Sequence, residues 1–268
     1  MKSLSFYLYV IVEEKINMND FFIKNRQGQN IAISLKRNNK QKGLAFIMPG
    51  LGNTKEEKNI QTFADSFFDK GFTVVSFDVT NGVGDSDGDY AKASFTGYYN
   101  DLCDVIDWAQ TQDWYIQPFV LVGHSMGGGC ILRYGADHPD RLLGLVTVAT
   151  VIGGHQTLAK FGRDDLPAIK KENGQEIIKK LDWKSFTKDI LQYDIVPEAY
   201  KLTMPVLMMV GDKDMGTPVE DQMKVYDGVA GDKEIYIIKG APHTFVEAEH
   251  LNETKEIIHN WLDNKILK

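Results

Sequence analysis

Short apolar runs and amphipathic stretches follow one another along most of the chain. The apolar runs are typical of buried strands, and the stretches between them place apolar residues at helical spacing. We predict strands within residues 43–50, 72–78, 118–123, 142–150, 204–211 and 233–240, and helices over about 55–70, 94–112, 126–138 and 247–264. Strands that alternate with helices predict an α/β fold with a mostly parallel central sheet and helices on both faces.

The N-terminal part contains a further pair of strands. Residues 20–37, DFFIKNRQGQNIAISLKR, read as two strands joined at Gln27-Gly28. The preceding apolar run, Leu4 to Val12, is too short to span a bilayer and lacks a small-residue cleavage site. We therefore expect a cytoplasmic protein without a membrane partner, and both Met1 and Met18 remain possible translation starts.

One long segment interrupts the alternation. Residues 152–203 contain no clear strand of the sheet, yet they carry several aromatic residues among many charges. Such a segment is too long for a simple connection between core strands. We predict a core formed by residues 1–151 and 204–268, and a small helical lid insertion formed by residues 152–203. Within it, the Lys-rich stretch IKKENGQEIIKK (169–180) is expected to be the solvated face of a helix.

Composition excludes some classes of function. The chain of 268 residues has a net charge of −7, so it has no excess of Lys and Arg for neutralising nucleic-acid phosphates. It has two cysteines, without the spacing of a metal site or a disulfide framework. The oligomeric state is left open, a homodimer included.

Candidate chemistry is concentrated in GHSMG, residues 123–127. A serine in G-x-S-x-G between a strand and a helix is typical of a nucleophile held on a tight, strained turn. Gly123 and Gly127 would remove side chains that collide with neighbouring elements, and the helix N-terminus would direct its amides at the reacting centre. We therefore predict that Ser125 is a nucleophile.

The nucleophile needs a base, and the base needs an orienting acid. Among the six histidines, His243 in KGAPHTF follows the last strand in a short loop, at the edge of the sheet where Ser125 is expected. The loop after the preceding strand offers Asp212 and Asp214, and we predict Asp214 as the acid because it lies further out on the turn. The order Ser125, Asp214, His243 is the one expected of the α/β-hydrolase fold.

The motifs GHSMGG, GDKD and GAPH resemble those of α/β-hydrolases, from about Phe21 to Leu267. MPGLGNTKEE resembles the oxyanion loop of that family, with Pro49 where histidine is usual, and FDVTNGVGDSDGDY resembles the segment after the next strand. Together with the insertion, these stretches are similar to bacterial cinnamoyl (feruloyl) esterases and serine-aminopeptidase-like hydrolases. The resemblance implies an oxyanion hole formed by the backbone N–H groups of Leu51 and Met126. Asp85, Ser86 and Asp87 are expected to brace their loop.

The sequence thus predicts a serine carboxylesterase that cleaves small to medium acyl esters, with hydroxycinnamoyl esters as one option. Its mechanism requires no metal or organic cofactor. His155 and Trp183 are candidate substrate contacts. Two alternatives stay open: an aminopeptidase-like peptidase or amidase, for which Asp164, Asp165 and Glu172 would supply an acidic pocket, and a catalytically silent ligand-binding member of the fold.

Overall fold

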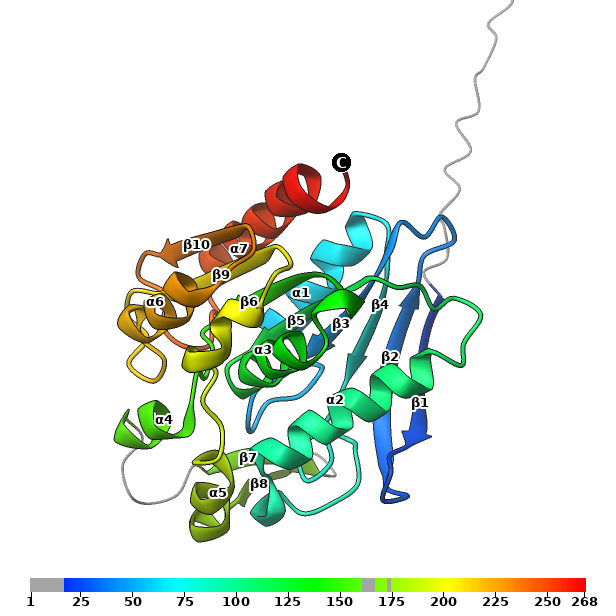
Figure 1. The fold of residues 1–268 in the computed structure, drawn as a ribbon. Helices are drawn as coiled ribbons and strands as arrows, with labels where there is room; N and C mark the ends of the chain where they lie inside the picture. Colours follow the sequence, from blue (N-terminus) through cyan, green and yellow to red (C-terminus); the bar gives the residue numbers. More distant parts are fainter. Residues whose placement is uncertain (1–16, 161–166, 173–174) are drawn as a thin grey trace, which may run out of the picture.

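The computed structural model describes residues 17–160, 167–172 and 175–268. Eight of its strands form one sheet in the order β1-β2-β4-β3-β5-β6-β9-β10 (Figure 1). These strands are β1 (Asn17–Lys24), β2 (Asn30–Arg37), β3 (Gly43–Met48), β4 (Phe72–Phe77), β5 (Phe119–His124), β6 (Leu142–Val148), β9 (Val206–Gly211) and β10 (Lys233–Ile238). Strands β1 and β2 pair antiparallel, β2 pairs antiparallel with β4, and all other neighbours are parallel. The predicted mostly parallel sheet is confirmed.

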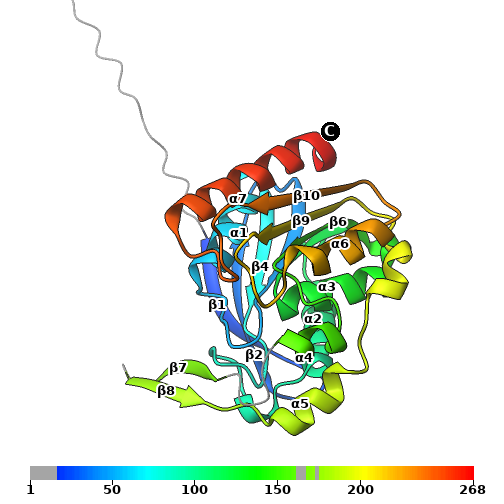
Figure 2. The same cartoon turned by 90° about the vertical axis from the view of Figure 1, so that its left-hand side faces the viewer.

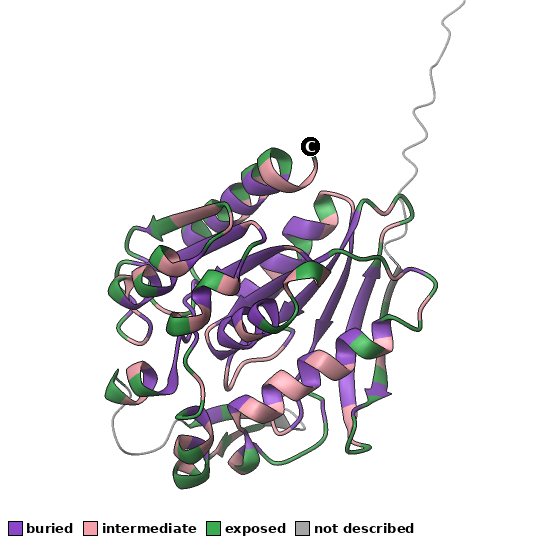
Figure 3. Cartoon of the chain, viewed as in Figure 1, coloured by how far each residue is buried: buried purple, intermediate pink, exposed green. Residues whose placement is uncertain are grey.

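Helices cover both faces of this sheet, as Figure 2 shows. On β3, Leu44, Phe46 and Met48 join one hydrophobic core, whereas Ala45 and Ile47 join the other, because successive side chains of a strand point to opposite faces. The first core contains residues of α2 (Phe95–Ala109), α3 (Met126–Asp137) and α6 (Val219–Gly228), and the second contains residues of α1 (Lys58–Asp69) and α7 (Ala248–Trp261). Burial on both faces explains the continuous apolar runs of the central strands (Figure 3).

Outside the segment between β6 and β9, the described chain also contains the shorter helical elements η1 (Tyr90–Lys92), η2 (Pro139–Arg141) and η4 (Leu262–Ile266). No helix in the described part of the chain is both long and apolar enough to cross a membrane.

The segment between β6 and β9 is not purely helical. It contains α4 (Gly154–Lys160), α5 (Trp183–Ile190) and η3 (Val196–Lys201), but also an antiparallel hairpin, β7 (Ala168–Glu172) and β8 (Gln175–Lys179). The hairpin extends away from the main sheet (Figure 2). The prediction that residues 169–180 form a helical face is therefore wrong. Asn-Gly at 173–174, a strong hairpin signal, was the clue in the sequence.

The carboxyl ends of β3, β5, β9 and β10 meet at one edge of the parallel sheet. The loops that follow these strands carry Leu51, Ser125, Asp214 and His243, respectively. The topology therefore brings together residues that lie far apart in the sequence.

Candidate active site

Ser125 lies on the sharp turn between β5 and α3. Its backbone has φ 54° and ψ −118°, a conformation that an L-residue rarely adopts. The Ser125 N–H donates to the carbonyl oxygen of Val148 at 2.9 Å, and the Ser125 carbonyl accepts from Val151 N–H at 3.0 Å. Neighbouring strand ends therefore hold the strained turn in place.

Two glycines make this turn possible. A Cβ atom on Gly127 would lie 2.4 Å from the carbonyl oxygen of Pro49, and one on Gly123 would lie 2.6 Å from the carbonyl of Gly127. Both distances are too short for real atoms. Gly127 thus allows the Ser125 turn to pack directly on the loop after β3, and Gly123 allows the end of β5 to pack against the start of α3.

Ser125, His243 and Asp214 form a continuous chain of hydrogen bonds. The distance from Ser125 Oγ to His243 Nε2 is 2.9 Å, and that from His243 Nδ1 to Asp214 Oδ2 is 2.8 Å. Asp212, the alternative acid, instead accepts a hydrogen bond from the Gly240 N–H at 2.7 Å. Asp212 therefore braces the start of the loop that carries His243.

The Asp214 carboxylate is buried and fully hydrogen-bonded. Oδ1 accepts from the N–H groups of Gly216 and Thr217, both at 2.9 Å, and Oδ2 accepts from the Thr217 hydroxyl at 2.7 Å. Burial opposes its ionisation. The bond to His243, the charge of that imidazole and the Thr217 donors outweigh burial and lower the pKa of Asp214 to about 2. A carboxylate that is charged at neutral pH therefore faces His243.

His124 forms a hydrogen bond with the backbone of His243. It lies directly before Ser125 and is completely buried. Its Nε2 lies 2.8 Å from the carbonyl oxygen of His243, so this nitrogen donates. Burial, reinforced by nearby His243, lowers the pKa of His124 to about 3, and the ring is neutral at ordinary pH. Apart from the position of His124 beside Ser125, no pattern in the sequence indicates this contact.

The loop after β3 lies directly on Ser125. A Cβ atom on Gly50 would be 2.9 Å from Ser125 Cβ. Leu51 and Met126 both line the pocket that contains Ser125. Among the hydrogen bonds of the described residues, none is donated by the backbone N–H of Leu51 or Met126. These two N–H groups are thus available to a ligand.

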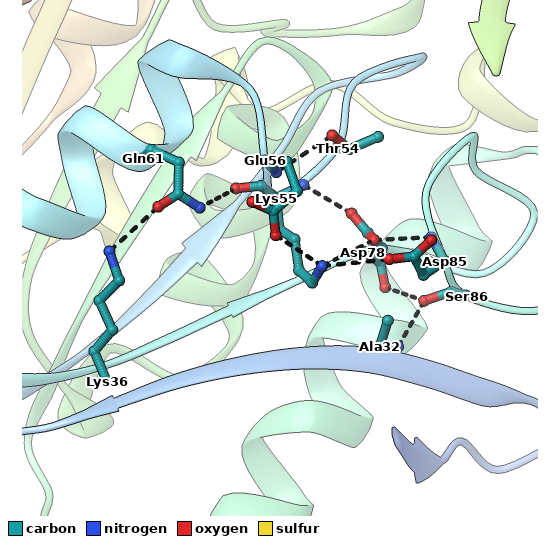
Figure 4. Close-up of polar contacts among 9 residues, drawn as sticks. All are labelled: Ala32, Lys36, Thr54, Lys55, Glu56, Gln61, Asp78, Asp85 and Ser86. Carbon is teal, nitrogen blue, oxygen red and sulfur yellow. Dashed lines mark hydrogen bonds and ion pairs between the residues drawn. The ribbon is translucent and has the colours of Figure 1, made fainter. Parts of the chain in front are cut away.

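A buried network fixes the far end of this loop (Figure 4). Asp78, after β4, accepts from the Lys55 N–H at 2.7 Å and from the Asp85 N–H at 2.9 Å. The Ser86 hydroxyl accepts from the Ala32 N–H at 2.8 Å and donates to the Asp78 carbonyl at 2.7 Å. This matches the expectation that the polar residues of the 85–87 segment brace their loop.

The Lys55 ammonium lies within the same network. Its side chain is 4% exposed, and Nζ is 2.9 Å from Glu56, 3.6 Å from Asp85 and 3.8 Å from Asp78. Burial favours the neutral amine, but the Glu56 hydrogen bond and the carboxylate charges prevail and raise the pKa of Lys55. For Asp78, burial has the larger effect: it raises the pKa of the carboxyl group, although the hydrogen-bond donors around that group act to lower it. Gln61 of α1 adds a bond from Nε2 to the Lys55 carbonyl at 2.6 Å.

A cavity of about 150 Å³ adjoins Ser125 and His243. Its other walls come from the loop after β3, η1, α3, the end of β6 and the insertion: Leu51, Tyr90, Met126, Val151, Thr157, Pro167, Phe186 and Ile190. Phe186 and Ile190 are one helical turn apart on α5 and are both buried. That i, i+4 spacing is the signal by which sequence reasoning could have found them.

Neither predicted substrate contact is among the described residues that line this cavity. His155 is exposed on α4, and Trp183 packs against Phe186 with ring centroids 5.9 Å apart. Asp164 and Asp165 lie outside the described residues, as does the side chain of Glu172. In the described part of the chain, no three His, Cys, Asp or Glu residues are grouped as metal ligands.

Comparison with known proteins relates the chain to hydrolases. A family model described as "Serine aminopeptidase, S33" matches residues 39–171. Rat palmitoyl-protein thioesterase ABHD10, mitochondrial, is 26% identical over 231 residues, which cover 80% of this chain and 72% of that protein.

Solved structures match nearly the whole chain. Est1E from Butyrivibrio proteoclasticus with bound ferulic acid has a TM-score of 0.78 at 20% identity, covering 92% of this chain and 100% of that one. Mouse ABHD10 has a TM-score of 0.73 at 20% identity, covering 91% and 98%. Likeness at this level of identity shows a common fold.

Proposed function

We propose that this chain, which has the α/β-hydrolase fold and matches a serine-aminopeptidase family model over residues 39–171, is a serine carboxylesterase acting on small to medium acyl esters, hydroxycinnamoyl esters among the options. One observation carries the proposal: Ser125, His243 and Asp214 are joined by hydrogen bonds of 2.9 and 2.8 Å beside an apolar cavity. These are the geometry and the residue types that acyl transfer needs.

In the acylation step, Ser125 Oγ attacks the ester carbonyl carbon and its proton passes to His243 Nε2. Asp214, charged and fixed by Thr217, holds the imidazole with Nδ1 protonated and stabilises the imidazolium that forms. The backbone N–H groups of Leu51 and Met126 donate to the oxyanion, each worth about 3 kcal/mol of barrier. As the tetrahedral intermediate collapses, the proton on Nε2 passes to the leaving alcohol.

Deacylation repeats these steps with water. His243 takes a proton from water, the resulting hydroxide attacks the acyl carbon, and the acid leaves as Ser125 recovers its proton from Nε2. The chemistry applies equally to a thioester, where a thiol leaves instead of an alcohol. The ABHD10 relatives are palmitoyl-protein thioesterases, which makes thioesters a second substrate class to be assayed. We propose a cytoplasmic location, as expected from the sequence.

An aminopeptidase-like activity is the main alternative and is favoured by the family description. It would need a carboxylate to bind the substrate amine. Among the described residues that line the cavity, none is acidic, which favours the esterase. A catalytically silent protein would have no need for a serine in strained geometry bonded to an oriented histidine.

Two experiments test the proposal. A fluorophosphonate probe should label the protein and should fail to label Ser125→Ala; a folded wild-type protein that stays unlabelled would refute the serine-hydrolase mechanism. A parallel panel of p-nitrophenyl esters, a hydroxycinnamate ester, an acyl thioester and an aminoacyl anilide then ranks the substrate classes. Faster turnover of the anilide than of every ester would establish the alternative.

A further inference from the structure

The cavity that adjoins Ser125 and His243, called the acyl cavity from here on, is small, and its volume limits the size of the acyl group that it can hold. A cavity of about 150 Å³ is large enough for a benzene ring. A palmitoyl chain is several times longer than such a space. The cavity therefore holds a short-chain or single-ring acyl group, whereas most of the long chain named for the ABHD10 relatives would have to lie outside it.

The side chains that line the acyl cavity also indicate which chemical class of acyl group it can bind. Apart from Ser125 and His243, the polar side chains among the described lining residues are those of Thr157 and Tyr90. The Thr157 hydroxyl donates to the Gly153 carbonyl at 2.8 Å, so its proton is already used. An ionised group on the acyl part would lose its hydration without gaining a counter-charge from these residues. The acyl group that fits best is neutral and apolar.

Two residues of the insertion close this cavity. Phe186 and Ile190 are each 1% exposed, and both project from α5 into its wall. Ile190 and Val151 also line a second, very small cavity that continues between α5 and α3 towards Phe95 and Tyr193. The side chain of Ile190 thus lies between the acyl cavity and this second cavity, and its truncation would join the two and lengthen the acyl cavity.

We propose that Phe186 and Ile190 are specificity-determining residues that restrict the enzyme to short or single-ring acyl groups. The proposal rests on the esterase function and on Ser125 as its nucleophile. In this proposal the insertion determines the length of the acyl group. The rest of the fold supplies the reacting groups, and one face of α5 forms the end wall of the acyl cavity.

The test is a chain-length profile of kcat/KM with p-nitrophenyl acetate, butyrate, hexanoate, octanoate, benzoate and palmitate. Wild type should be fastest with butyrate, hexanoate or benzoate. Phe186→Ala and Ile190→Ala should each raise the octanoate-to-butyrate ratio by about tenfold or more, since a single methylene in an apolar pocket is worth roughly 10–200-fold. Two variants are used because either could fold poorly, and thermal melting identifies that case.

Leu191→Ala is the matched control. Leu191 directly follows α5, is 38% exposed and is not among the cavity-lining residues, so the profile should stay as in wild type. A wild-type optimum at palmitate, or well-folded variants of both residues with unchanged ratios, would overturn the proposal while leaving the esterase function standing. A wild-type protein inactive on every ester would instead refute the proposed function.

Discussion

The imidazole of His124 donates a hydrogen bond from Nε2 to the carbonyl oxygen of His243, at 2.8 Å. The residue before Ser125 therefore holds the backbone of the proposed base. Its other face packs near the loop after β3, where a Cβ atom on Gly50 would lie 3.2 Å from His124 Nδ1. The pKa of His124, about 3, keeps the ring neutral near pH 7, and the bond to the carbonyl requires that its one ring proton is on Nε2.

We predict that His124→Ala lowers kcat by about ten- to a hundredfold with little change in KM, since small displacements of catalytic groups are costly. His124→Gln, which retains a side-chain N–H donor, should recover part of the loss. Steady-state kinetics with one fast ester measures both. The control is His138→Ala, an exposed histidine beyond α3, which should leave kcat unchanged. An unaltered kcat in His124→Ala would show that the His243 loop needs no such support.

Asp214→Asn should reduce kcat by about 10⁴, because an amide cannot keep the His243 tautomer that the base requires. The fold should survive, since the Asn carbonyl can still accept from the N–H groups of Gly216 and Thr217. Asp212→Asn is the matched variant: it should retain the bond from Gly240 N–H and lose less than about tenfold. Equal losses in the two variants would reassign the acid.

The lowered pKa of Asp214 predicts an acid-dependent contribution to stability. A folded-state pKa of about 2, against an unfolded value near 3.9, contributes about 2 to 3 kcal/mol. Because the folded pKa is depressed, this stability is complete above about pH 5 and is lost as the pH falls towards 2. Urea unfolding of wild type and Asp214→Asn should therefore give a difference at pH 7 that narrows on acidification. A difference independent of pH would contradict the assignment.

The sequence was sufficient for the residues whose placement follows from topology. Ser125, Asp214 and His243 each follow a strand of a parallel sheet, and the carboxyl ends of such strands share an edge. The choice of Asp214 over Asp212 relied on distance along the turn, which is a local property.

The sequence did not predict the features that depend on contacts between distant segments of the chain. The cavity walls combine Tyr90, Val151 and Phe186 from three separated segments, and no periodicity relates them. Trp183 and Phe186 are both aromatic on α5, yet only Phe186 reaches the cavity. The hairpin β7–β8 was missed because lysines at its ends resembled a polar helix, whereas cross-strand pairing of Ile169 with Ile178 made it a sheet.

Asp78→Ala should weaken both stability and catalysis. It removes the acceptor for the buried N–H of Lys55, at a cost of about 1–3 kcal/mol, and for the partly buried N–H of Asp85, and it leaves the Lys55 ammonium without its most buried counter-charge (Figure 4). Because Lys55 ends the loop that begins at Gly50, the Leu51 N–H should be displaced from the oxyanion. Loss of one such donor lowers kcat about 10²- to 10³-fold.

Asp87→Ala provides the comparison, because Asp87 is an exposed residue of the same loop that accepts from the Asn30 N–H of β2 at 2.7 Å. It should cost about 1 kcal/mol of stability and leave kcat unchanged. Urea unfolding and kcat are measured on both variants, below the onset of unfolding. If Asp78→Ala lost stability but kept its kcat, the network would support the fold without positioning the oxyanion loop. If Asp87→Ala slowed turnover as strongly, the effect would belong to the whole 78–87 loop and not to the contact between Asp78 and Lys55.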